Sequence, residues 1–143
     1  DQLERVLTLA GALPDLRIVV DHFGWPTDLS DAGRSAHLAR LRELAAAPHL
    51  ATRIDALGTI FGAWTVDQVR PWVEGTIDAF GSNRCMIGTD YPIESLRTSY
   101  ADLYGAYDEM LRDLTPDQRE DLFSETAHCW LDAAGVRPED DLV

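Results

Sequence analysis

The order of helical and strand patterns predicts an α/β fold with about three parallel strands and flanking helices. Short apolar runs rich in β-branched residues fall at residues 16–23 and 84–90, a weaker strand pattern falls at 50–59, and helical spacing fills the segments between them. Strands that alternate with helices in this way are typical of right-handed βαβ units in a parallel sheet. A complete (β/α)8 TIM barrel needs about 250 residues. The 143 residues are therefore predicted to form one domain, residues 1–143, that is the C-terminal part of such a barrel.

The helices are justified by apolar periodicity and by capping residues at their starts. They are predicted at residues 3–13, 30–47, 66–80, 99–114 and 115–135. Ser30 or Asp31 is the expected N-cap of the second helix, Thr65 caps the third, and Thr115 opens the last. Pro71 falls inside the third helix, so the first turns of that helix are expected to form a separate short piece.

Composition narrows the classes of partner. The chain is 45% hydrophobic and 26% charged, as expected of a soluble globular domain, and its formal charge of −13 argues against a nucleic-acid partner. No apolar run approaches the roughly 18 residues of a membrane span, so a cytoplasmic location without membrane association is predicted. Cys85 and Cys129 lack metal-ligand spacing and are expected to be small buried hydrophobes in a reducing compartment. The chain begins at Asp1 in the middle of a helical pattern, which suggests that a further segment preceded it.

Two ionisable residues lie where predicted strands end. His22 ends the first strand and Asp90 ends the third, and catalytic groups in parallel barrels come from the carboxyl ends of strands. Together they could bind a divalent cation or share base and electrophile roles around one water molecule. Each also has a purely structural explanation, because His22 could fix a loop and Asp90 could form the turn before Tyr91-Pro92. Their matched positions favour a functional interpretation.

Other residues near these strand ends are candidates for substrate binding. Trp25 and Tyr91 could wall a pocket, although aromatic loop residues often only pack. Arg97 could pair with a substrate carboxylate, or it could simply be solvated. Arg53 is predicted to point into the barrel or to pair with Asp55 or Asp21.

The remaining tryptophans and histidines are assigned to structure rather than chemistry. The tryptophans predicted to pack helices against the barrel exterior are Trp64, Trp72 and Trp130. The histidines for which no catalytic role is expected are His37, His49 and His128.

Three stretches of sequence together carry a family resemblance. "PDLRIVVDHFGWP", "VRPWVEGTIDAFGSNRCMIGTDYPI" and "SYADLYGAYDEML" resemble the C-terminal half of amidohydrolase family 2, a group of metal-dependent TIM-barrel hydrolases, and in particular its lactonase-like branch. The resemblance implies that His22, at the end of the sixth barrel strand, helps to bind metal or the substrate carbonyl. It also implies that Asp90, at the end of the eighth, activates the hydrolytic water. The family's His-x-His motif of the first strand has no counterpart in this sequence.

The activity implied by the resemblance is hydrolysis of a lactone or related cyclic ester. Asp90 would take a proton from water, and His22 or a divalent metal such as Zn²⁺ or Mn²⁺, held by His22 and Asp90, would stabilise the oxyanion. Some lactonase-like members are thought to work without metal, so the cofactor stays open. The alternatives are a decarboxylase or hydratase of the same superfamily, and a truncated, non-catalytic chain that completes its sheet with a partner. The expected partners are a small-molecule substrate and, as an open alternative, further copies of the chain in a homo-oligomer.

Overall fold

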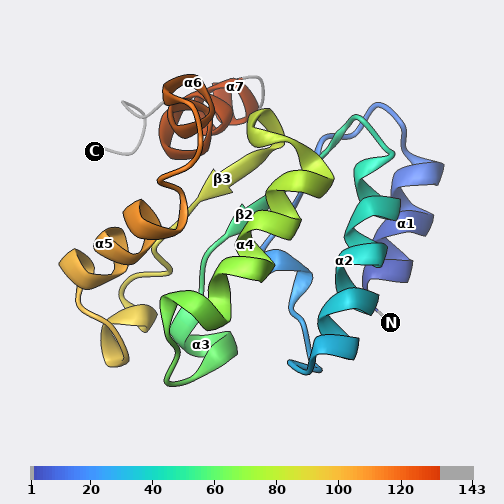
Figure 1. The fold of residues 1–143 in the computed structure, drawn as a ribbon. Coiled ribbons are helices and arrows are strands. Elements are labelled where there is room, and N and C mark those ends of the chain that lie inside the picture. The colour runs from blue at the N-terminus through green and yellow to red at the C-terminus, as the bar shows by residue number, and fades with distance from the viewer. Residues whose placement is uncertain (1, 133–143) are drawn as a thin grey trace.

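Three parallel strands lie in the order β1-β2-β3 at the centre of the fold (Figure 1). In the computed structural model, which describes residues 2–132, they are β1 (Ile18–Val20), β2 (Leu50–Ile54) and β3 (Cys85–Ile87). The register pairs Val19 with Ala51 and Arg53 with Met86. Parallel pairing in chain order confirms the predicted βαβ arrangement, and all three strands are shorter than the sequence patterns suggest.

Helices precede, connect and follow the strands. They are α1 (Gln2–Ala12), α2 (Asp31–Ala45), α3 (Leu57–Phe61), α4 (Val66–Phe80), α5 (Tyr100–Met110), α6 (Pro116–Glu120) and α7 (Thr126–Asp132). Short 3-10 turns form η1 (His22–Gly24), η2 (Ser82–Arg84) and η3 (Ile93–Leu96). The predicted caps are confirmed: the Ser30 hydroxyl accepts from the Gly33 backbone N–H, and Thr65 and Thr115 each form a capping box.

Three element predictions were wrong. The segment after β2 does not continue as a strand to residue 59 but turns at Ala56, in the left-handed region with φ 57°, and forms α3. Helix α4 is continuous through Pro71, since this proline lies near its start and the capping box and buried residues such as Trp72 hold the first turns. The last predicted helix is divided by a π-helical turn, η4 (Asp121–Glu125), and its predicted residues 133–135 lie outside the described residues.

The two faces of the sheet are covered differently. Helices α2 and α4 pack side by side over one face (Figure 1), where Leu50, Ile54 and Cys85 belong to the main core. Because side chains alternate along a strand, Ala51 and Met86 point to the opposite face, where they form a separate cluster with Trp130.

The predicted position of Trp130 on the barrel exterior was therefore wrong. The Arg17 guanidinium lies 5.2 Å above the Trp130 ring, and Arg17 Nη1 donates to the Cys129 carbonyl at 3.1 Å. These contacts hold α7 across the start of β1 and carry Trp130 onto the face away from α2 and α4. Trp72 is buried in the main core and Trp64 packs against it, as expected.

The two cysteines differ in environment. Cys85 is buried in β3, whereas Cys129 is exposed on α7, so the expectation that both are buried was wrong for Cys129. Burial raises the pKa of the Cys85 thiol to about 12. No helix among residues 2–132 is both long enough and apolar enough to cross a membrane.

Candidate functional site

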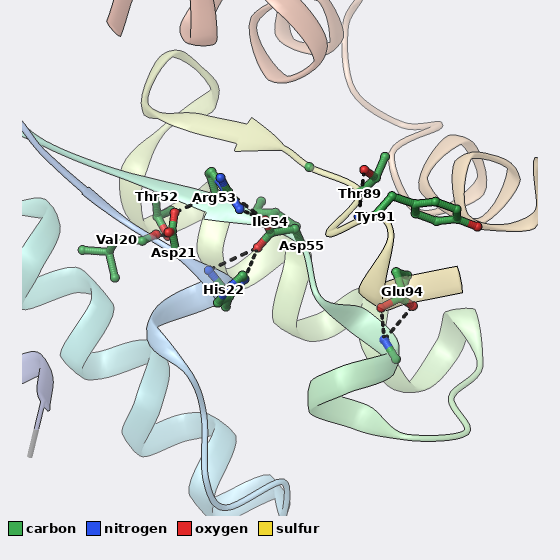
Figure 2. Close-up of polar contacts among 12 residues, drawn as sticks. Val20, Asp21, His22, Thr52, Arg53, Ile54, Asp55, Thr89, Tyr91 and Glu94 are labelled. Carbon is green, nitrogen blue, oxygen red and sulfur yellow. Dashed lines mark hydrogen bonds and ion pairs between the residues drawn. The ribbon is translucent and has the colours of Figure 1, made fainter. Parts of the chain in front are cut away.

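Each strand leads at its carboxyl end to an ionisable residue, and the three are His22, Asp55 and Asp90. Figure 2 shows His22 and Asp55 side by side at the ends of β1 and β2. His22 and Asp90 both adopt left-handed backbone conformations, with φ 56° and 55°. Such a conformation costs a non-glycine residue on the order of 1–3 kcal/mol and persists only where the surroundings hold it. Strained residues of this kind cluster at functional sites, so their position at two strand ends supports a site here.

Asp55 is the centre of a polar network at these ends. Its side chain is fully buried. Oδ1 lies 2.7 Å from His22 Nδ1 and accepts from the His22 backbone N–H at 3.2 Å. Oδ2 accepts from Arg53 Nε at 2.9 Å and from Arg53 Nη2 at 2.5 Å. Figure 2 shows these contacts converging on one carboxylate from two neighbouring strands.

Arg53 links this network to the other acidic residues. Its Nε lies 3.2 Å from Asp21 Oδ1, so both pairings predicted for Arg53 are present. Burial works against the charged form of Arg53, but the carboxylates of Asp55, Asp21 and Asp90 outweigh it and raise the pKa of Arg53. Asp90 therefore lies within electrostatic range of the network, although no direct contact joins it to His22 among the described residues.

Two cavities open beside the network. The larger, of about 580 Å³, lies between the strand ends and α7 and is lined by Arg53, Asp55, Asp90, Tyr91, Met86 and Trp130, among others. The smaller, of about 410 Å³, is lined by His22 and Trp25, and it shares Val19 and Asp21 with the larger one. Asp90 and His22 thus face adjoining spaces, each with a polar group and an apolar wall.

The predicted substrate-binding residues take three different positions. Trp25 is 45% exposed and its ring makes an edge contact with His22 at 5.6 Å between centroids. Tyr91 lines the larger cavity, and its hydroxyl donates to the Thr98 carbonyl at 2.6 Å. Arg97 is exposed at the end of η3 and lies outside the residues that line either cavity.

Two buried side chains fix the loops that follow β2 and β3. The Glu94 carboxylate, fully buried, accepts from the Gly58 backbone N–H at 2.8 and 3.0 Å, and the Glu94 backbone N–H donates to the Asp90 carbonyl at 2.9 Å. The Tyr107 hydroxyl lies 3.1 Å from the carbonyls of both Ile54 and Gly88. These contacts hold the loop of Asp90 against the end of β2, where Asp55 lies.

The described residues alone do not make a metal site. No group of three or more His, Cys, Asp or Glu side chains that could hold an ion is present among residues 2–132. A catalytic zinc ion usually has three protein ligands. The donor set of this part of the chain, centred on His22 and Asp90, therefore does not by itself fit the predicted ion.

The sequence analysis did not predict that Asp55 forms hydrogen bonds with His22. Asp55 directly follows β2, as His22 and Asp90 follow β1 and β3 at short distances. The rule that functional groups lie at the carboxyl ends of parallel strands would have identified it. It was instead read only as an ion-pair partner of Arg53, because the weak strand pattern was extended past it.

Comparison with known proteins identifies one matching family model and several relatives. The family model described as "Amidohydrolase" matches residues 1–132. An L-fucono-1,5-lactonase of Burkholderia ambifaria is 34% identical over 131 residues, covering 87% of this chain and 44% of that protein. An uncharacterised protein of Sinorhizobium fredii is 32% identical over 126 residues, covering 88% of this chain and 42% of that protein.

Among solved structures, a crystal structure of an amidohydrolase from Burkholderia multivorans with bound zinc superposes with a TM-score of 0.80 at 28% identity. The match covers 90% of this chain and 48% of that one. The chain thus spans less than half the length of the curated relatives named above and about half of the solved amidohydrolase chain.

Proposed function

We propose that this chain, which belongs to the amidohydrolase family, carries the Asp90 and His22 part of an active site that opens a lactone or related cyclic ester. The observation that carries the proposal is the position of Asp90. It lies past the end of β3 in a strained conformation, half-buried, and lines a cavity of about 580 Å³ beside the network of Arg53 and Asp55. The 34% identity to a protein named as an L-fucono-1,5-lactonase supports a lactone as the substrate class.

Asp90 acts as the general base in the proposed reaction. Its carboxylate takes a proton from a water molecule as that water attacks the lactone carbonyl, and the tetrahedral intermediate then expels the ring oxygen. Asp90 returns the proton to this leaving alkoxide, so that one water is consumed and a hydroxy acid is formed. His22 lines the adjoining smaller cavity, of about 410 Å³. No step is assigned to a metal ion, because the described residues do not supply a set of ligands for one.

The test uses the complete product of the reading frame that encodes this chain, assayed with a panel of sugar and alkyl lactones, with and without Zn²⁺ or Mn²⁺. We expect Asp90→Asn to lower kcat by about 10²–10⁴-fold, the usual contribution of a positioned general base. Asp78→Asn is the matched control, because Asp78 is exposed on α4 and makes the same change of charge. Full activity in Asp90→Asn would contradict the proposal.

A further inference from the structure

We propose that Asp55 is a positioning residue that holds His22 in the tautomer with hydrogen on Nδ1, so that Nε2 faces the site as a hydrogen-bond acceptor. The catalytic role given to Nε2 rests on the proposed function. The tautomer itself follows from the partners of Asp55 alone and can be measured without a substrate.

The hydrogen-bond donors around Asp55 allow only one position for the proton on the His22 ring. Arg53 has only donors, and two of them point at Oδ2. The His22 backbone N–H, also only a donor, points at Oδ1. A carboxylate in a paired contact with a guanidinium is ionised and accepts only. The imidazole nitrogen 2.7 Å from Oδ1 must therefore be the donor, which places the proton on Nδ1.

The Asp55 carboxylate is held in this orientation by its surroundings. Asp55 is fully buried, and each of its oxygens has two donors. The backbone directly after β3 lies close to this carboxylate, because a Cβ added at Gly88 would lie 2.9 Å from Asp55 Oδ2. The backbone of His22 is held through its N–H by the same carboxylate as its ring, which fixes the ring relative to the left-handed turn.

The consequence concerns the chemistry available to His22. Its side chain is 27% exposed, and Nε2 has no hydrogen-bond partner among the described residues. A neutral imidazole held on Nδ1 presents a lone pair at Nε2, so it can accept a hydrogen bond but cannot donate one to a carbonyl. Neutral His22 therefore accepts a hydrogen bond from a donor group, such as a substrate hydroxyl or the attacking water, and does not bond the lactone carbonyl.

The test is ¹⁵N NMR of the labelled chain, in which long-range couplings to the imidazole carbons identify which ring nitrogen of His22 carries the proton at a pH where the ring is neutral. We expect the Nδ1–H form in the unsubstituted chain. In Asp55→Asn the two guanidinium donors of Arg53 favour the amide oxygen over the single backbone N–H of His22, which loses its acceptor. The amide NH₂ group then faces Nδ1, and the proton should move to Nε2. Asp21→Asn is the matched control, because Asp21 contacts Arg53 but not His22 in these bonds, and it should leave the tautomer unchanged.

An Nε2–H form in the unsubstituted chain would overturn the inference, even if Asp55→Asn fails to fold. An unchanged tautomer in folded Asp55→Asn would also overturn it. In the complete enzyme, Asp55→Asn should lower kcat by about 10–100-fold, the range known for carboxylates that orient a metal-bound histidine. If lactones are not hydrolysed at all but the tautomer is as expected, the proposed function fails while the assignment of Asp55 stands.

Discussion

Tyr107 offers a quantitative test of how the two candidate strand ends are held together. Its ring is fully buried on α5, and its hydroxyl lies 3.1 Å from the carbonyls of Ile54 and Gly88. These carbonyls lie one residue before Asp55 and two before Asp90. Tyr107→Phe removes the O–H donor while leaving the ring that fills the core, so no large cavity is created.

The expected cost follows from the hydrogen bond that is lost. A buried hydrogen bond contributes about 0.5–1.5 kcal/mol, and a buried group left without its partner costs about 1–3 kcal/mol. One O–H serves two carbonyls here, so we expect Tyr107→Phe to lower the free energy of unfolding by about 2 kcal/mol. With a urea m-value of about 2 kcal/mol/M, the unfolding midpoint should fall by about 1 M.

The assay is urea unfolding followed by tryptophan fluorescence, which reports on buried Trp72 and Trp130. Tyr100→Phe is the control, because Tyr100 is 55% exposed and its hydroxyl is open to water. That variant should change the free energy of unfolding by less than about 0.5 kcal/mol. Equal midpoints for the two variants would refute the idea that Tyr107 joins β2 to β3.

Two further predictions concern titratable side chains. At pH 8 a thiol reagent should modify exposed Cys129 in the native chain but Cys85 only after unfolding, because burial raises the pKa of Cys85 to about 12; equal labelling rates would contradict this. Burial lowers the pKa of His37 below 6.5, although its Nε2 contact with the Phe23 carbonyl opposes the shift. As the pH falls through about 6.5, the unfolded chain therefore binds more protons at His37 than the folded chain does. The free energy of unfolding should then decrease as the pH is lowered. His37→Gln should reduce this fall in urea unfolding between pH 8 and pH 5, and an unchanged pH dependence would contradict the assignment.

The parts of the fold that local patterns determine were predictable. Apolar runs and helical spacing predicted the alternation of helices with three parallel strands, and capping residues such as Ser30 and Thr65 predicted where helices begin. The left-handed turn at Ala56 had no glycine to signal it. Trp130 was misplaced because helical spacing shows which residues share a face but not which side of the sheet that face meets.

The positions of His22 and Asp90 after two strand ends were predictable because each strand could be treated by itself; their catalytic roles stay predictions. The contacts between strands could not be predicted, since they depend on register. Asp55 meets His22 because β2 lies beside β1, and Glu94 reaches Gly58 across 36 positions of sequence. The carboxylate of Glu94 gives no sign in the sequence that it is buried.

Water is proposed here to open a lactone at its carbonyl, with Asp90 as the base. The most direct measurement is mass spectrometry of the product formed by the complete enzyme in H₂¹⁸O. We expect a ring-opened hydroxy acid with one ¹⁸O atom in its new carboxylate, and loss of this product in Asp90→Asn. Release of CO₂, addition of water to a carbon–carbon double bond, or a labelled acid formed equally well by Asp90→Asn would contradict it.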